Sequence, residues 1–202
     1  MKTIFFIRHG QTDYNKNGII QGSGVDSELN EKGRSQAQAF FEFYKNEPFQ
    51  VVYHSALQRT RQTVQPFIDL GIPSRQTADI DEICWGVHEG KPYEPWMGDA
   101  YATMLKNWSE GNLDASLQEG ESAQQLLDRL GHFLEHIKTI DEDYILVCSH
   151  GRAMRAMLTL LKDEHPREME KYKHHNTALW KTTFDGQRFL VLAENDTQHL
   201  DQ

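Results

Sequence analysis

Short, uninterrupted runs of hydrophobic residues alternate along the chain with longer segments in which hydrophobic residues recur every three or four positions. The runs at residues 4–7, 51–54 and 144–148 are typical of buried strands. Two later segments, 178–183 and 188–193, mix hydrophobic with polar residues; they are separated by a turn with Asp-Gly and predict a β-hairpin. The longer segments predict helices at residues 31–44, 57–70 and 152–161, and a further helix that begins at Ser122.

The order of these elements predicts an α/β fold. Strands that alternate with helices form a mostly parallel sheet with helices on both faces, so we expect a three-layer α/β/α sandwich. The chain has 202 residues, 38% of them hydrophobic, and no evident linker, which predicts a single domain over residues 1–202. Residues 86–121 fit no regular element well. Their aromatic residues suit either packing or a lid over the strand ends, and we expect a lid-like excursion.

Polar residues suited to phosphate chemistry follow three of the predicted strands. Arg8 and His9 follow the first strand, Arg59 follows the second, and His150 follows the strand at 144–148. The carboxyl ends of parallel strands meet at one edge of a sheet, where open α/β sheets place their ligands. Guanidinium groups bind phosphate oxygens, and a neutral imidazole is a suitable nucleophile toward a phosphomonoester dianion. The pattern therefore predicts a phosphate site at this edge.

Further short motifs occur in a fixed order along nearly the whole chain. The set comprises Arg8-His9-Gly10-Gln11-Thr12 with Asn15, Gln21-Gly22, Leu29-Asn30-Glu31-Lys32-Gly33, Ser55-Ala56-Leu57-Gln58-Arg59 with Gln62-Thr63, Glu82-Ile83, Glu89-Gly90, Gly120-Glu121-Ser122, Ser149-His150-Gly151 with Arg155, and Asn176. Together these motifs resemble those of the histidine phosphatase superfamily, the phosphoglycerate mutase-like enzymes. Two positions depart from the family's frequent pattern: Ile19-Ile20 stand where an arginine is common, and His88 stands where a tryptophan is common.

The resemblance implies a phosphoglycerate mutase-like fold and a reaction through phosphohistidine that needs no metal and no cofactor. It implies that His9 is the nucleophile and that Glu82 protonates the leaving group and later activates water. Arg8, Arg59 and a protonated His150 would neutralise the transferring phosphoryl group. The substrate-binding residues that it implies are Thr12, Asn15, Gln21, Gly22 and Gly151.

These roles favour a metal-independent phosphomonoester hydrolase that acts on a small phosphorylated metabolite. A phosphoglycerate mutase-type transfer is the alternative, and the chain length favours the hydrolase because mutases of the family tend to be longer. A non-catalytic scaffold is a third interpretation, but a scaffold has no use for all five catalytic residues. The acidic neighbours of Glu82, Asp79 and Asp81, are expected to stay solvated.

Charge and cysteine content restrict the partners and the compartment. The formal net charge of −9 argues against binding to nucleic acid or to an anionic membrane surface. The hydrophobic run before Arg8 is too short for a signal peptide or a membrane span. Cys84 and Cys148 have no CxxC spacing and predict free thiols in the cytoplasm. His174-His175 lack a third ligand at a zinc-site spacing, so no metal is expected, and the sequence allows a homodimer.

The segment at residues 86–121 also bears on the choice of substrate. It contains two lysines and seven acidic residues, so it offers few cations to a second acidic group of a substrate. With Ile19-Ile20 in place of an arginine, we expect a leaving group that is neutral and partly apolar or sugar-like. Bisphosphates and phosphoglycerates are then expected to be poor substrates.

Overall fold

The predicted hydrophobic strands, joined by one short exposed strand, form a central sheet. The computed structural model describes residues 1–92 and 94–201. Its strands are β1 (Lys2–Arg8), β2 (Val51–His54), β3 (Ser74–Gln76), β4 (Tyr144–Ser149), β5 (Leu179–Phe184) and β6 (Phe189–Asp196). The order is β3-β2-β4-β1-β5-β6, with parallel pairing from β3 to β1 and antiparallel pairing of β5 with β1 and β6. The prediction of a mostly parallel sheet is confirmed.

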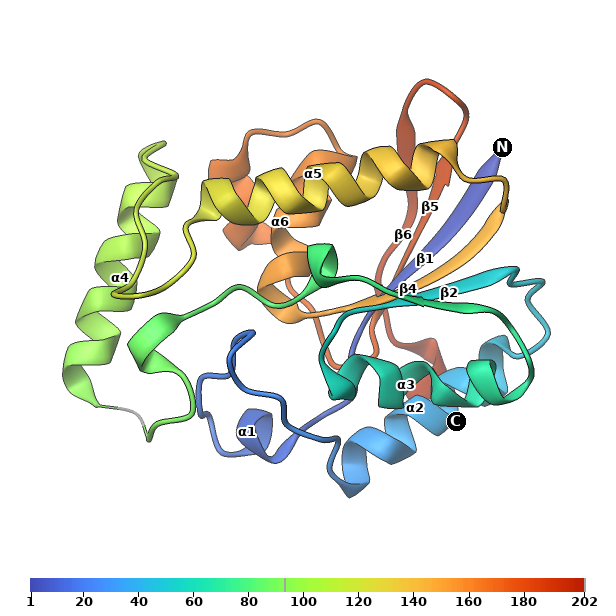
Figure 1. Cartoon of the computed structure of the whole chain (residues 1–202), viewed down its shortest axis with the longest axis horizontal. Helices are drawn as coiled ribbons and strands as arrows, with labels where there is room; N and C mark the ends of the chain where they lie inside the picture. The colour runs from blue at the N-terminus through green and yellow to red at the C-terminus, as the bar shows by residue number, and fades with distance from the viewer. Residues whose placement is uncertain (93, 202) are drawn as a thin grey trace.

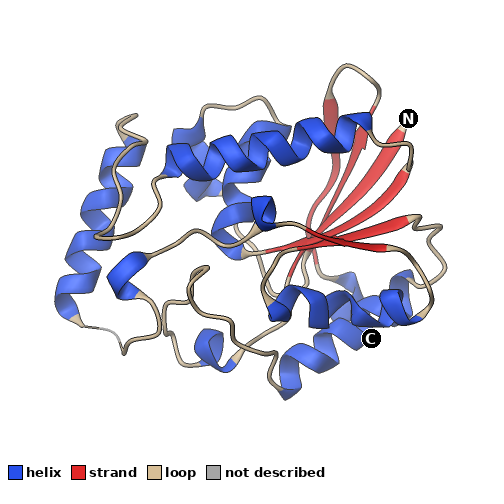
Figure 2. Cartoon of the chain, viewed as in Figure 1, coloured by secondary structure: helices blue, strands red, loops and turns tan. Residues whose placement is uncertain are grey.

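Helices cover both faces of this sheet (Figures 1 and 2). They are α1 (Asp13–Lys16), α2 (Glu31–Tyr44), α3 (Gln58–Asp69), α4 (Pro95–Ser109), α5 (Ala123–Thr139) and α6 (Gly151–Leu161). Short 3-10 helices lie at Ala78–Ile80, Gly86–His88, Pro166–Lys171 and Gln198–Leu200. The pair α2 and α3 packs on one face and the pair α5 and α6 on the other. The three-layer sandwich is therefore confirmed.

The hydrophobic core lies on both sides of the sheet, because neighbouring residues of a strand face opposite ways. In β1, Ile4 and Phe6 pack with residues of α5 and α6. Phe5 and Ile7 pack with residues of α2 and α3, and all four side chains are fully buried. The next residue, Arg8, is only partly buried. The strand thus carries a charged residue out of the core at the carboxyl edge of the sheet.

The segment at residues 86–121 contains the long helix α4, so the expectation that it fits no regular element is wrong. Pro95 lies in the first turn of α4, where proline is favoured. Met104 and Trp108 are buried by their packing, whereas Gly98 interrupts the hydrophobic pattern and weakens the sequence signal. The helix lies beyond the carboxyl ends of the parallel strands, at the left of Figure 1.

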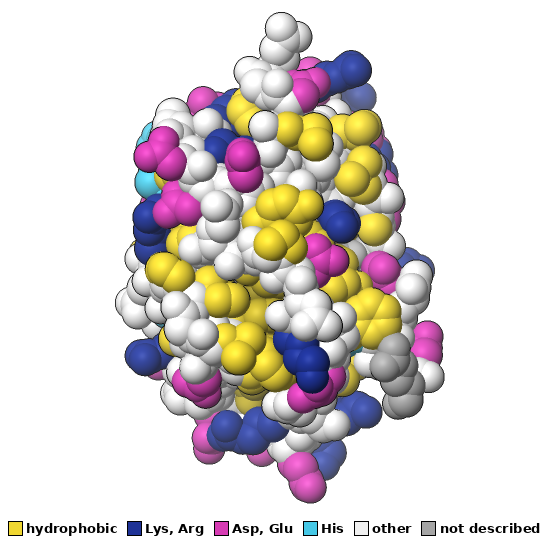
Figure 3. Space-filling model, turned by 90° about the vertical axis from the view of Figure 1, so that its right-hand side faces the viewer, with side chains coloured by type: hydrophobic (Ala, Val, Ile, Leu, Met, Phe, Trp, Pro, Cys, Tyr) yellow, Lys and Arg dark blue, Asp and Glu magenta, His cyan; other side chains and the backbone are white. Residues whose placement is uncertain are grey.

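The surface gives two further observations. None of the helices in the described part of the chain is long and apolar enough to cross a membrane. The end of the molecule opposite α4 carries hydrophobic side chains between lysine, arginine and acidic ones (Figure 3). The homodimer that the sequence allows stays a prediction.

Candidate active site

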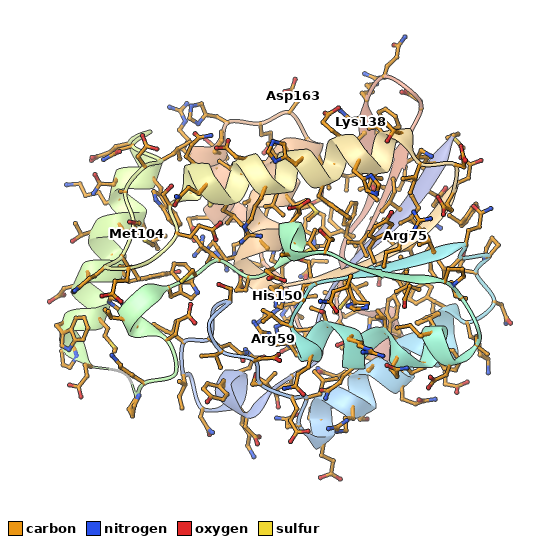
Figure 4. All side chains as sticks on the ribbon, viewed as in Figure 1. Arg59, Arg75, Met104, Lys138, His150 and Asp163 are labelled. Carbon is orange, nitrogen blue, oxygen red and sulfur yellow. The ribbon has the colours of Figure 1, made fainter. Side chains whose placement is uncertain are left out.

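Three strand ends converge at the carboxyl edge of the sheet. β1 and β4 are neighbours, with Arg8 opposite Ser149. The residues that follow these two strands, His9 and His150, therefore lie close together, with ring centroids 5.1 Å apart. Arg59, in the first turn of α3, lies next to His150 at the centre of Figure 4. The structure thus brings together the cations and imidazoles that follow the three strands.

The imidazole of His9 is buried and fixed by the backbone. Its Nδ1 lies 2.7 Å from the carbonyl oxygen of Gly10, so Nδ1 carries the proton and Nε2 keeps its lone pair. Burial, Arg59 and Arg8 lower the pKa of His9 well below its usual range. A Cβ on Gly10 would lie 2.5 Å from the carbonyl oxygen of Gly33, so this close approach requires glycine. The local backbone therefore presents a neutral nucleophile.

Arg8 and Arg59 form no ion pair with an acidic side chain among residues 1–92 and 94–201. The ion pairs of arginine side chains in the described part of the chain involve other arginines. Arg59 donates to the carbonyl oxygens of Gly22 and Val25 at 3.2 and 2.7 Å. Arg8 donates to the carbonyl oxygen of His174 at 3.2 Å, and its buried Nε lacks a hydrogen-bond partner among residues 1–92 and 94–201. Because buried cations without a counter-ion are costly, the pair suits an anionic ligand.

His150 is buried and neutral in the structure. Arg59 donates from Nε to Nδ1 of His150 at 3.2 Å, and Nε2 of His150 lies 2.8 Å from the hydroxyl of Ser55. Nδ1 is therefore an acceptor, and Nε2 carries the proton. Burial, Arg59 and His9 lower the pKa of His150 well below its usual range. This state differs from the expected imidazolium, because burial and neighbouring cations disfavour a further positive charge.

Glu82 is buried at the N-terminus of α6. Its Oε1 accepts hydrogen bonds from the backbone N–H groups of Ile83 and Ala153, each at 3.0 Å. Its Oε2 accepts one from the N–H of Arg152, also at 3.0 Å. The positive end of the helix dipole and these donors hold the carboxylate in one position. Since Glu82 also lines the cavity described next, it is placed to act on a bound substrate.

The acidic neighbours of Glu82 are partly buried rather than fully solvated. Asp81 accepts a hydrogen bond at Oδ1 from the backbone N–H of Ala56 at 2.7 Å. Burial raises the pKa of Asp81. The expectation that Asp79 and Asp81 stay solvated is therefore wrong for Asp81, because its carboxylate holds the turn that leads into α3.

A cavity of about 350 Å³ opens beside His9. The predicted site residues that line it are Arg8, His9, Asn15, Gln21 and Glu82. The other lining residues are Ile19, Ile20, Trp85, Met97, Gly98 and Tyr101. Three of these come from α4, so this helix covers part of the cavity. Arg59 and His150 have no exposed surface and lie next to the lining residues.

Three predicted substrate-binding residues do not line this cavity. Thr12 is fully buried, caps α1 and accepts a hydrogen bond from Nε2 of Gln21 at 2.8 Å. A Cβ on Gly22 would lie 2.4 Å from the backbone carbonyl oxygen of Ile83, so this close approach requires glycine. These two residues shape the loop that carries Gln21. Gly151 lines a second, smaller cavity.

The second cavity, of about 200 Å³, has residues in common with the first and contains groups that the sequence did not single out for the site. Arg152, Arg155 and His174 line it. Both arginines belong to α6, whereas the expectation of a pocket poor in cations considered only residues 86–121. That expectation is wrong, because Arg152 and Arg155 bring cations to the site from α6.

The part of the chain that the structure describes contains no group of three or more His, Cys, Asp or Glu side chains that could hold a metal ion. His174 and His175 have different surroundings. The first lines the second cavity, whereas the second is exposed, with Nδ1 3.1 Å from Nδ2 of Asn195.

Comparison with known proteins yields related enzymes that match over the whole chain. Phosphoserine phosphatase 1 of Hydrogenobacter thermophilus is 27% identical over 202 residues, which cover 99% of this chain and 95% of that protein. A phosphoserine phosphatase of Entamoeba histolytica, solved in complex with 3-phosphoglyceric acid, is 27% identical, with a TM-score of 0.84 and coverage of 99% and 100% of the two chains. The alpha-ribazole phosphatase of Shigella flexneri shares the fold, with a TM-score of 0.84 at 20% identity over 96% of each chain.

The family described as the histidine phosphatase superfamily (branch 1) matches residues 4–197. This match includes both strand ends that carry His9 and His150, the turn with Arg59, and Glu82. Since the family match spans nearly the whole chain and the two relatives at 27% identity are named phosphatases, this chain belongs to the histidine phosphatase superfamily, as one of its phosphatases.

Proposed function

We propose that the chain hydrolyses small phosphorylated metabolites through a phosphohistidine on His9, without a metal ion. The observation that carries this proposal is the bond of Nδ1 of His9 to the carbonyl oxygen of Gly10, which leaves Nε2 with a lone pair. His9 lines the larger cavity together with Arg8 and Glu82. A neutral nucleophile beside guanidinium groups that form no ion pair among the described residues suits attack on a dianionic phosphoryl group.

The relatives support a small substrate. Two of them are named phosphoserine phosphatases. The enzyme of Entamoeba histolytica was solved with 3-phosphoglyceric acid, and a mutant of it with phosphoserine. A cavity of about 350 Å³ has room for a metabolite of that size.

In the first step of the proposed reaction, Nε2 of His9 attacks phosphorus, and the bond from phosphorus to the leaving oxygen breaks. Glu82 in its acid form gives a proton to this oxygen, so that an alcohol departs and a carboxylate remains. Oε1 of Glu82 accepts two backbone hydrogen bonds and Oε2 accepts one. Oε2 is therefore the oxygen better placed to carry the proton.

In the second step, water attacks the phosphoryl group of phosphohistidine. Glu82 accepts a proton from this water, the bond between phosphorus and nitrogen breaks, and the electron pair returns to Nε2 of His9. Inorganic phosphate departs, and both side chains return to their starting states. One carboxyl group thus acts as acid in the first step and as base in the second.

The cations around His9 balance the charge of the phosphoryl group in both steps. Arg8 and Arg59 supply donors in a planar fork that matches phosphate oxygens. Burial is the largest cause of the lowered pKa of His150, and a bound dianion would oppose the smaller effect of the guanidinium groups and so favour the charged imidazole that the proposed role requires. Loose phosphoryl-transfer transition states require mainly positioning and charge stabilisation, which these three residues provide in place of a metal.

The segment at residues 86–121 serves in this proposal as the lid of a single domain over residues 1–202. Met97 and Tyr101 of α4 line the cavity and exclude water from one side of it. The proposed compartment is the cytoplasm, because Cys84 and Cys148 are free thiols.

Release of inorganic phosphate tests this function and separates it from mutase activity. We expect the wild-type chain to release phosphate from p-nitrophenyl phosphate and from at least one small phosphorylated metabolite, and His9→Ala to release none. Conversion of 3-phosphoglycerate to its 2-phospho isomer without release of phosphate would show a mutase. Phosphate release by folded His9→Ala at the wild-type rate would contradict the proposal.

A further inference from the structure

The second cavity adjoins the larger one beside Glu82. It shares four lining residues with the larger cavity, namely Arg8, Glu82, Trp85 and Tyr101. Its remaining lining residues are Gly151, Arg152, Arg155 and His174. Because Glu82 protonates the leaving oxygen in the proposed reaction, the part of the substrate attached to this oxygen has direct access to the second cavity.

Three buried nitrogen atoms at this cavity lack hydrogen-bond partners among the described residues. They are Nε of Arg8 and both ring nitrogens of His174. Burial and the charges of Arg8 and Arg155 lower the pKa of His174 to about 3, so its imidazole is neutral and offers one N–H donor. A buried donor without a partner is costly to stability, and a ligand that accepts from it removes that cost.

Apart from Arg8 and Glu82, which act on the phosphoryl group and the leaving oxygen, the charged side chains around the cavity leave one positive charge to balance. Arg152 and Arg155 bring two guanidinium groups. Glu170 brings one carboxylate, which accepts from Arg152 and, at 2.7 Å, from Arg155. Two positive charges against one negative one leave one positive charge. A carboxylate neutralises this excess, whereas a second phosphate dianion exceeds it.

Contacts with aromatic side chains hold the guanidinium group of Arg152 in a fixed position beside the second cavity. The guanidinium carbon of Arg152 lies 5.7 Å from the ring centre of Trp85 and 5.6 Å from that of Trp108. Its Nη2 donates to the hydroxyl of Tyr101. Because Tyr101 and Trp108 come from α4 and Trp85 precedes the 3-10 helix at Gly86–His88, these segments and α6 together fix the cation beside the cavity.

We propose that the second cavity binds a carboxylate carried by the leaving group, and that His174 is the donor that recognises it. The preferred substrates are then phosphomonoesters of small hydroxy acids. This inference rests on the hydrolase proposed above and names its substrate class. It reverses the preference for neutral leaving groups that the residues at 86–121 alone suggest.

A pair of substrates that differ by one carboxylate tests the inference. O-phosphoserine and phosphoethanolamine share the phosphate, the ammonium group and the carbon chain between them. We expect the wild-type chain to hydrolyse O-phosphoserine with a kcat/KM at least about tenfold higher, as one hydrogen bond to a charged group provides. His174→Ala should remove most of this ratio, mainly by raising KM for O-phosphoserine, and should leave phosphoethanolamine nearly unchanged.

Two further variants control for misfolding. His174→Gln keeps an N–H donor of similar length, so it should retain much of the ratio. His175→Ala alters the exposed neighbour, which lies outside the cavity, and should keep the wild-type ratio. A wild-type ratio near one, or an equal loss on both substrates in folded His174→Ala, would overturn the carboxylate subsite. Failure to hydrolyse even p-nitrophenyl phosphate would instead overturn the hydrolase on which the subsite rests.

Discussion

Glu82 accepts a hydrogen bond at Oε2 from the backbone N–H of Arg152 at 3.0 Å, so the proposed acid is tied to the first turn of α6. That helix begins directly after His150. The acid and the buried imidazole are therefore positioned by the same piece of backbone. Any change that shifts the start of α6 is expected to move both groups relative to His9.

The substitution Glu82→Gln is expected to slow turnover of alkyl phosphates by about 10²–10⁴-fold, the usual contribution of general acid and base catalysis. The amide keeps the size of the side chain but cannot donate and accept a proton in turn. The loss should be smaller for p-nitrophenyl phosphate, because a phenolate departs without protonation. Steady-state kcat values for both substrates check this expectation.

The neighbouring acid provides the control for this experiment. Asp79→Asn should keep activity close to that of the wild type, since Asp79 does not line either cavity. Equal losses for the alkyl and the aryl substrate in Glu82→Gln would show that Glu82 does not protonate the leaving group.

The buried guanidinium of Arg59 is expected to be irreplaceable by lysine. Arg59 donates to Gly22, Val25 and His150 at once, and a single ammonium group cannot reproduce that geometry. We expect Arg59→Lys to lower kcat/KM by about 10²-fold or more, as loss of a preorganised donor does. Arg61→Lys, an exposed change two residues away, is the control and should have little effect. Similar activities of the two variants would contradict the role of Arg59.

The free energy of unfolding is expected to decrease as the pH is lowered below about 6.5, the ordinary pKa of histidine. The folded state lowers the pKa of His9 and His150, so below this pH the unfolded chain binds protons that the folded chain does not. Each of these residues then costs up to ~1.4 kcal/mol of unfolding free energy per pH unit. Urea unfolding at pH 7.5 and 5.5 measures the slope. His150→Asn should make it shallower, and an unchanged slope would show that His150 is protonated in the folded state.

Activity is expected to survive removal of divalent metal ions, because Arg8, Arg59 and the phosphate-bound form of His150 supply the positive charge that a metal would supply. Incubation with EDTA followed by an assay in metal-free buffer checks this point. Loss of activity that one added divalent ion restores would contradict the proposed mechanism.

The sequence predicted the elements of the sheet well where hydrophobic periodicity is strong. It placed the strand that leads to Arg8 and the helix at residues 31–44 correctly. It missed β3, because Ser74–Gln76 is an exposed, polar strand at the sheet edge with no hydrophobic pattern. It also missed α4, whose pattern is weakened by Gly98.

The site was less predictable than the fold, because its outer wall depends on packing between distant segments. The sequence does not show that Arg152 of α6 packs against Tyr101 and Trp108 of α4, or that His174 comes to the same cavity from near β5. It also does not show that burial keeps His150 neutral beside Arg59. Such properties follow from tertiary contacts and not from motif spacing.

The central claim is that His9 carries the phosphoryl group during turnover, and chemical trapping of the intermediate tests it most directly. The wild-type chain is mixed with a ³²P-labelled phosphomonoester, quenched within milliseconds and separated from the substrate, and the label is located by peptide mapping. The account predicts an alkali-stable, acid-labile phosphoenzyme with the label on the peptide that contains His9, and no label in folded His9→Ala. Full turnover with label on another residue, or the same labelling of His9→Ala, would contradict it.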